Sequence, residues 1–373
     1  MRKFSLLVLA VLGFAFVACD DDDHLGDWAK APEFSGKMRN QAVSFTIGDN
    51  VYVGLGFGVD LSEYTDFKRF DTKAMTWYDV EDTFKDMPDA KGRHGAIAFT
   101  AEVDGKTYAY IGLGYIAPNG VGRQKEYLKD FWRYDAETNT WKKLPDFPGT
   151  ERRDAVAFSL GGYGFVGTGR ADNAEMFKDF YRFDPKTETW SGDLGFLGGQ
   201  RYGATAFVID GAAYVCLGLS GGSPRTDVTK CTVDANGNVT WEAMQALADK
   251  PKVKQDKDYG RIPRGYAISF ISNRGKDGES YAYIATGSQG PNLQTVWKYN
   301  HKKDQWHQME NIAGGSITGA VGFVVDGYGY YTTGGTSIDP TGAVSSNASS
   351  YFSNTSWRFI PDVKEDRAND YDY

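Results

Sequence analysis

Positive charge, cysteine and long apolar segments are all scarce in this 373-residue sequence. Its 41 Lys and Arg face 49 Asp and Glu, which gives a formal net charge of −8 and a pI near 5.2. An acidic balance offers no attraction to nucleic acid or to an anionic membrane surface, so neither is expected as a partner. No internal apolar run approaches the ~20 residues that a membrane-spanning helix needs. Glycine, with 45 residues, and aromatic side chains, at 15%, are abundant, which is typical of short, tightly turned strands.

The first 18 residues have the pattern of an export signal. Arg2 and Lys3 form a basic start, and residues 6–17 form an apolar stretch of the length found in signal peptides. Residues 16–19, Phe-Val-Ala-Cys, resemble a bacterial lipobox, although Phe replaces the usual aliphatic residue at the first position. We therefore expect cleavage before Cys19 and lipidation of that cysteine. The alternative is an ordinary signal peptide with a cysteine there by chance.

Four aspartates follow Cys19 directly and begin an acidic tether over residues 19–26. An acidic run at this place resembles the surface-export signal of Bacteroidota lipoproteins. The resemblance implies a protein of the outer membrane that faces outward and meets the membrane only through its lipid anchor. The alternative is a solvated tether with no targeting role.

A recurring Trp organises the rest of the chain. Successive members are 49, 64, 49, 51 and 65 residues apart, and self-similarity at a period near 50 is the signature of a repeat architecture. The repeated residues are Trp28, Trp77, Trp141, Trp190, Trp241 and Trp306.

The segments between these tryptophans share one pattern of four short strands. In one unit the strands, a to d, are expected at 93–99, 108–114, 130–135 and 140–141, and the unit at 155–190 repeats the same order. Glycine at the end of strand b allows the inner strands to approach closely. One such unit cannot bury both of its faces, so the set must close into a ring.

The two ends of the chain explain how the ring closes. The last unit has a strand c at 357–359 but no Trp-containing strand d after it. The missing strand is at the start, where residues 27–32 parallel residues 140–145. We therefore predict an all-β, six-bladed propeller in one domain, residues 27–361, closed by the N-terminal strand. Residues 362–373 form an acidic tail.

This pattern resembles the kelch, galactose-oxidase-like propellers, and in particular the six-bladed bacterial group that includes N-acetylneuraminate epimerase-type proteins. The resemblance covers nearly the whole chain after the export signal. It implies the fold strongly and the function weakly, because propellers of this kind carry unrelated activities.

The longer connections all belong to one face of the predicted ring, the face of the d–a and b–c loops. They are residues 115–129, 242–263 and 336–354, whereas the a–b and c–d turns are short. Long loops on a rigid scaffold are common places for binding, so we expect the binding site at this mouth of the central channel. The alternative is simple tolerance of insertions at exposed loops.

An arginine precedes strand a in five of the six predicted blades. Each lies six residues before the strand-a Phe, and the sixth blade has Ile317 instead. Five guanidiniums around one mouth would suit an anionic ligand, because Arg offers a planar fork to a carboxylate. The five residues are Arg39, Arg93, Arg152, Arg201 and Arg264.

The alternative for these arginines is a structural role within the repeat, bonded to loop carbonyls or to nearby acids such as Asp130. Four further residues near the predicted ring complete the candidate ligand-binding set: Tyr202, Tyr266, His94 and Asp154. The tyrosines could stack on a sugar or cap the core. Among the 4 histidines only His94 reaches the mouth, so copper chemistry and a Ser-His-Asp triad are not expected, and no metal or cofactor is predicted.

Three functions stay open on the sequence. The first is a surface binding module for a small anionic or glycan ligand, which it would pass to an outer-membrane transporter. The second is a metal-free sugar epimerase or mutarotase of the sialic-acid type, which needs only positioned acids and bases. The third is a protein-interaction platform. Cys216 and Cys231 fall on neighbouring strands of one blade, where a disulfide and two buried thiols are both possible.

Overall fold

The computed structural model describes residues 24–60, 62–118, 122–235, 237–250, 258–337 and 352–364. The predicted signal peptide, Cys19, most of the tether and most of the acidic tail lie outside these residues, so those assignments stay predictions. Within the described part of the chain, no helix is long and apolar enough to cross a membrane.

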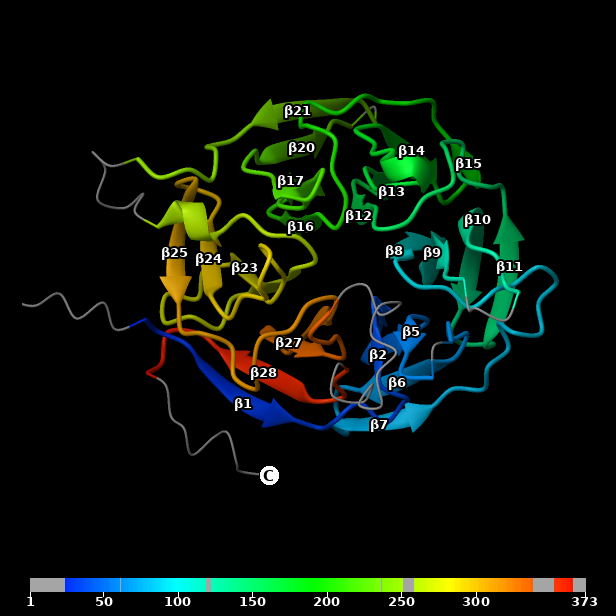
Figure 1. Ribbon diagram of the computed structural model, residues 1–373, viewed down its shortest axis with the longest axis horizontal. Helices are drawn as coiled ribbons and strands as arrows, with labels where there is room; N and C mark the ends of the chain where they lie inside the picture. The colour runs from blue at the N-terminus through cyan, green and yellow to red at the C-terminus, as the bar shows by residue number, and fades with distance from the viewer. Residues whose placement is uncertain are drawn as a thin grey trace, which may run out of the picture.

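Six four-stranded antiparallel sheets surround a central axis, as the sequence predicts (Figure 1). Blade one consists of β3 (Val43–Ile47), β4 (Asn50–Gly54), β6 (Phe67–Asp71) and β7 (Thr76–Asp79). Blade two consists of β8 (Ile97–Val103), β9 (Lys106–Ile116), β10 (Glu126–Asp135) and β11 (Thr140–Leu144). Blade three consists of β12 (Val156–Leu160), β13 (Tyr163–Gly167), β14 (Phe180–Asp184) and β15 (Thr189–Trp190). Blade four consists of β16 (Thr205–Ile209), β17 (Ala212–Cys216), β20 (Thr229–Val233) and β21 (Val239–Ala243). Blade five consists of β22 (Ile268–Ser272), β23 (Tyr281–Ala285), β24 (Val296–Asn300) and β25 (Gln305–Met309). Blade six consists of β26 (Val321–Val325), β27 (Tyr328–Thr332), β28 (Ser356–Ile360) and β1 (Asp27–Ala31).

Small elements lie in the loops between strands b and c and in the loops between strands d and a. They are the pairs β2 (Arg39–Asn40) with β5 (Phe57–Gly58) and β18 (Leu219–Ser220) with β19 (Ser223–Pro224), and the 3-10 turns η1 (Asp172–Ala174) and η3 (Tyr259–Arg261). The expected loop at 115–129 is partly strand, because β9 and β10 continue past the blade as a hairpin.

The N-terminal strand closes the ring, as predicted. β1 pairs antiparallel with β28, so that Trp28 lies opposite Phe359 and completes blade six (Figure 1). The Trp28 ring packs 4.9 Å from Phe359 and 5.2 Å from Tyr331. The first and last strands of the propeller thus share one sheet, and their pairing closes the ring.

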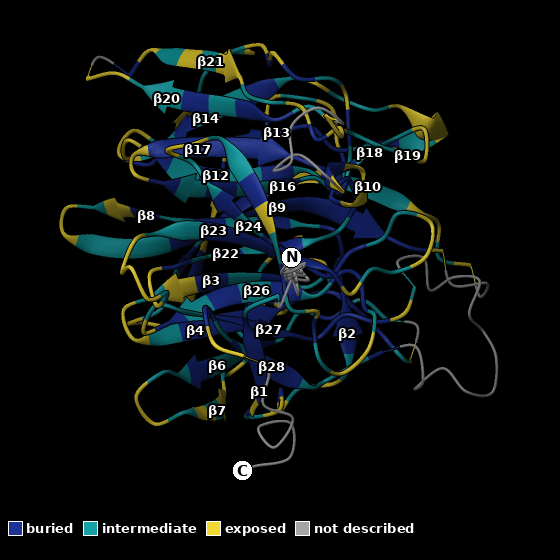
Figure 2. Ribbon diagram, turned by 90° about the vertical axis from the view of Figure 1, so that its left-hand side faces the viewer, coloured by how far each residue is buried: buried dark blue, intermediate teal, exposed yellow. Residues whose placement is uncertain are grey.

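An aromatic pair repeats in every blade and fills the core. The strand-a Phe stacks on an aromatic residue of strand b, with ring centroids 5.1 to 5.4 Å apart and interplanar angles of 10 to 15°. In Figure 2 the buried residues are concentrated in the strands and the exposed residues in the turns. The six pairs are Phe45–Tyr52, Phe99–Tyr110, Phe158–Phe165, Phe207–Tyr214, Phe270–Tyr283 and Phe323–Tyr330.

Two rings of backbone hydrogen bonds join neighbouring blades near the mouth. In the inner ring, each residue two positions after the arginine position donates its N–H to the equivalent carbonyl of the adjacent blade, at 2.8 to 3.4 Å. In the outer ring, a glycine after each strand b donates to the carbonyl at the arginine position of the next blade, at 2.7 to 2.9 Å. The inner ring comprises Gln41, Gly95, Asp154, Gly203, Tyr266 and Gly319. The glycines of the outer ring are Gly56, Gly114, Gly169, Gly218, Gly287 and Gly334.

The two cysteines of blade four are free thiols. Cys231 lies opposite Ala213, and these two share the core cluster that faces blade three. Cys216 belongs to the cluster on the other side of the sheet, which faces blade five. Opposite faces of one sheet place the sulfurs too far apart for a bond. Burial raises the pKa of each thiol to about 12.

Candidate functional site

The five arginines before strand a are scaffold residues with fully buried side chains. Arg93 is representative: its Nε donates to the carbonyl of Lys91 at 3.0 Å, Nη1 donates to the carbonyl of Leu113 at 3.2 Å, and Nη2 lies 2.7 Å from Oδ2 of Asp130. The arginine thus fastens the loop before strand a to the start of strand c in the same blade. The other carboxylate partners are Asp66, Asp179 and Asp227.

The expectation that these arginines line the mouth for a ligand is therefore corrected. A guanidinium with no exposed surface, whose three nitrogens are all hydrogen-bonded in its own blade, has no face to offer an anion. The structural alternative, in which each arginine belongs to the repeat, fits this geometry. In blade six the same position holds Ile317, which packs in an apolar cluster with Trp357.

Blade five departs from the other four because it has no aspartate at this place. Arg264 instead makes five hydrogen bonds to neutral acceptors, among them a 2.7 Å bond from Nη2 to the hydroxyl of Thr295. Burial and the neighbouring charge of Arg261 lower the pKa of Arg264.

A different set of charged side chains converges at the mouth. His94 is buried between Glu63 of blade one and Arg153 of blade three: its Nε2 lies 3.0 Å from Arg153 Nη1, and its Nδ1 lies 3.4 Å from Glu63 Oε1. Because arginine can only donate, Nε2 is the acceptor and Nδ1 carries the proton toward Glu63. Burial lowers the pKa of His94, the hydrogen bond with Glu63 opposes that shift, and Arg153 adds to it, so the imidazole is neutral at pH 7.

Asp154 is the second buried acid of the mouth, with a side chain only 1% exposed. Its Oδ2 accepts from Arg170 Nε at 2.8 Å and from the Tyr266 hydroxyl at 2.9 Å, and Arg153 Nε lies 3.6 Å away. Burial alone would raise the pKa of Asp154, but the charges of Arg170 and Arg153 and the bond from Tyr266 outweigh it and lower the pKa. The carboxylate is therefore ionised at neutral pH and anchors both guanidiniums.

Arg170 is a partly exposed guanidinium bound to this acid. Its Nε is bound to Asp154, its guanidinium lies 4.4 Å from the ring centroid of Tyr202, and its side chain is 23% exposed. Its two Nη atoms make no hydrogen bond or ion pair to the described part of the chain. Glu63 anchors a further guanidinium, that of Arg123, at 2.7 Å, so the mouth gathers three arginines around two carboxylates. With neutral His94 this cluster is positively charged in an otherwise acidic protein.

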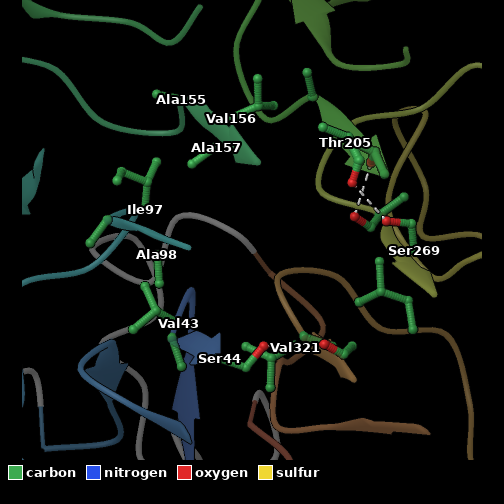
Figure 3. Close-up of a pocket in the computed structure, with 18 residues that line it drawn as sticks. Val43, Ser44, Ile97, Ala98, Ala155, Val156, Ala157, Thr205, Ser269 and Val321 are labelled. Atoms are coloured by element: carbon green, nitrogen blue, oxygen red, sulfur yellow. Dashed lines mark hydrogen bonds between the residues drawn. The ribbon is translucent and has the colours of Figure 1, made fainter. Parts of the chain in front are cut away.

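Below the mouth runs an axial channel of about 340 Å³. Small residues of strand a line it, and Figure 3 shows Ser44, Thr205 and Ser269 among them at the channel wall. Their hydroxyls donate to backbone carbonyls of neighbouring blades at 3.1 Å. The inner ring and the alanines after it line a smaller space of about 130 Å³ at the mouth end. None of the described residues that line this channel is charged.

The structure brings together four of the residues proposed from the sequence, His94, Asp154, Tyr202 and Tyr266. Their connecting partners were missed, because Arg153 and Arg170 look like ordinary loop residues in a single repeat. Aligning the repeats gives a signal: the residue after the scaffold arginine differs in every blade, and it is at this position that His94 and Arg153 stand. No group of three or more His, Cys, Asp or Glu side chains suited to a metal occurs among the residues that the structure describes.

Six four-stranded blades around one axis define a six-bladed kelch-type propeller. A family model described as the KLHDC2/KLHL20/DRC7 Kelch-repeats domain matches residues 28–218, just over half of the chain, and the chain belongs to this kelch-repeat family. The solved structure described as "Structure of YjhT" superposes with a TM-score of 0.64, covering 87% of this chain and 95% of that one. At 17% sequence identity this likeness shows the shared fold alone.

Two curated relatives match a shorter segment. They are the N-acetylneuraminate epimerases of Haemophilus influenzae strains PittEE and 86-028NP, each 35% identical over 99 residues. The matched segment is 26% of this chain and spans only 23% of those relatives.

Proposed function

We propose that this propeller binds a small acidic sugar, or a related carboxylate, at the mouth between blades two and five. The observation that carries the proposal is Arg170, whose Nε is held by a buried carboxylate at the mouth while its side chain is 23% exposed and its two Nη atoms make no hydrogen bond or ion pair with the described part of the chain. A fork fixed in this way matches the two oxygens of a carboxylate and loses little entropy on binding.

The surroundings of Arg170 support a sugar over a bare anion. Tyr202 lies under the guanidinium and Tyr266 lies beside it, with the two tyrosine ring centroids 6.2 Å apart. Aromatic side chains of this kind suit the C–H face of a pyranose. The partial match to N-acetylneuraminate epimerases points to the same ligand class, because N-acetylneuraminate is an acidic sugar.

A second candidate function is epimerisation or mutarotation of such a sugar without a metal. The pairing of His94 with Glu63 favours it, because a neutral imidazole oriented by a carboxylate is suited to move protons at neutral pH. The same short match to the epimerases supports this candidate.

Exchange NMR with N-acetylneuraminate distinguishes the two candidates. Binding without faster exchange of the anomers supports the binding module, and catalytic acceleration that is lost in His94→Gln supports the enzyme. Absence of any binding by the wild-type protein contradicts both. Lys91→Ala serves as control, since Lys91 pairs with Glu126 at the exposed surface.

We further propose that a lipid on Cys19 holds the propeller on the outward face of the outer membrane, where it would pass its ligand to a transporter. The lipobox-like residues 16–19 and the four aspartates that follow support this location. Protease treatment of intact cells should remove the propeller from the wild type. A Cys19→Ala variant should leave the outer-membrane fraction, and retention of that variant in the membrane contradicts the anchor.

A further inference from the structure

Residues of the inner ring alternate between glycine and a larger side chain. Blades two, four and six contribute Gly95, Gly203 and Gly319, and blades one, three and five contribute Gln41, Asp154 and Tyr266. All six have a positive φ, between 53° and 65°. Glycine adopts this conformation freely, whereas for a bulky residue such as tyrosine it is strained.

The alternation has a steric reason. A Cβ atom added to Gly203 would lie 3.0 Å from the ring of Tyr266, and one added to Gly95 would lie 2.6 Å from Oδ1 of Asp154. The glycines therefore leave the room that the large side chains of the neighbouring blades fill. Together the six residues narrow the mouth end of the axial channel.

The strained backbone conformation of Tyr266 goes together with one specific contact of its side chain. Its ring passes over Gly203 of blade four, and its hydroxyl reaches Asp154 of blade three at 2.9 Å. Asp154 in turn holds Arg170 Nε at 2.8 Å. A residue kept in a strained conformation at a position where three blades use glycine indicates a functional constraint.

We infer that Tyr266 is a positioning residue of the ligand site: it acts through Asp154 to hold Arg170 with its Nη edge toward the mouth. The inference rests on the proposed function, since it explains how the carboxylate-binding fork is fixed. It also makes the inner ring the floor of the site, so that the ligand stops above the channel. A small acidic sugar, and not a chain threaded along the axis, is the ligand class that this floor admits.

Tyr266→Phe tests the inference, because it keeps the ring and removes only the hydroxyl. Tyr283→Phe is the matched control, since the buried Tyr283 hydroxyl has no partner in the described part of the chain. Calorimetry with N-acetylneuraminate should show binding weakened roughly tenfold in Tyr266→Phe and unchanged in Tyr283→Phe. Equal affinity of Tyr266→Phe and wild type would overturn the inference.

Crystal structures of the same variants separate this inference from the proposed function. In Tyr266→Phe the contact between Arg170 Nε and Asp154 Oδ2 should be lost, and its retention would overturn the positioning role whether or not the wild type binds N-acetylneuraminate. If Tyr266→Phe does not fold, Tyr266→Asn is the second variant. Asn tolerates a positive φ and is too short to reach Asp154 over Gly203.

Discussion

The Nη2 atom of Arg264 donates a 2.7 Å hydrogen bond to the hydroxyl of Thr295, at the place where blades one to four present an aspartate. Blade five thus buries a guanidinium without the carboxylate that accompanies it elsewhere. The indole of Trp297 also donates to Thr295, as Trp132 does to Asp130 in blade two. The local geometry of the two blades is therefore the same, and only the charge is missing.

Thr295→Asp should stabilise the protein by about 1 kcal/mol, because it supplies a charge-assisted partner to Arg264. Urea unfolding at pH 7 measures the change, with Thr295→Ser as a control that keeps the hydroxyl and adds no charge. A Thr295→Asp protein that is less stable than the wild type would show that five neutral acceptors already satisfy Arg264.

Removal of a scaffold arginine should destabilise the fold. Arg93→Ala leaves Asp130 half-buried without its partner, and we expect a loss of about 3 kcal/mol of unfolding free energy. The double variant that combines Arg93→Ala and Arg201→Ala should fail to fold. Lys91→Ala, which removes an exposed ion pair next to Arg93, should cost less than about 1 kcal/mol. A stable double variant that has lost only ligand binding would instead restore the arginines as ligand contacts.

The outer hydrogen-bond ring should tolerate no side chain at its glycines. Gly218 has φ +86°, and a Cβ there would lie 2.9 Å from the carbonyl oxygen of Tyr202. Gly218→Ala combines backbone strain with this clash and should cost about 3 kcal/mol. Gly222 has nearly the same φ, +82°, with open space around it, so Gly222→Ala should cost only about 1 kcal/mol. Equal losses in thermal unfolding would mean that the contact with Tyr202 is unimportant.

Stability should fall in mild acid because of His94. Its pKa is lowered in the folded protein, so below about pH 6.5 the unfolded chain takes up a proton that the folded chain resists. The free energy of unfolding should therefore fall as the pH drops from 7.5 to 5.5, by about 1 kcal/mol more in the wild type than in His94→Gln. Urea unfolding at the two pH values measures this, and an identical drop in both proteins would exclude His94 as the cause.

Most of the fold, but only part of the candidate site, can be predicted from the sequence. The period of the tryptophans and the missing strand d after Trp357 determine the blade count and the closure through Trp28, because each depends on a pattern local to one repeat. The mouth depends on differences between repeats. Arg170 is a single loop residue bound to Asp154, which in turn accepts from Tyr266, two blades away from it. No pattern within one repeat predicts these contacts.

The scaffold arginines show the opposite limit. Their spacing correctly placed them beside strand a, but spacing does not tell which way a side chain points. Arg93 turns into its own blade because Asp130 and the Leu113 carbonyl lie there, 2.5 to 3.2 Å away. In blades one to four an aspartate stands at the start of strand c, where it pairs with the arginine of the same blade. An alignment of the repeats that included this aspartate would have favoured the structural role of the arginines.

Binding of a carboxylate by Arg170 can be measured by calorimetric titration of N-acetylneuraminate and its neutral methyl ester into the wild type and Arg170→Gln. We predict that the wild type binds the acid at least tenfold more tightly than the ester, and that Arg170→Gln loses this preference. Equal binding of acid and ester by the wild type, or full retention of the preference in Arg170→Gln, would show that Arg170 does not bind the carboxylate.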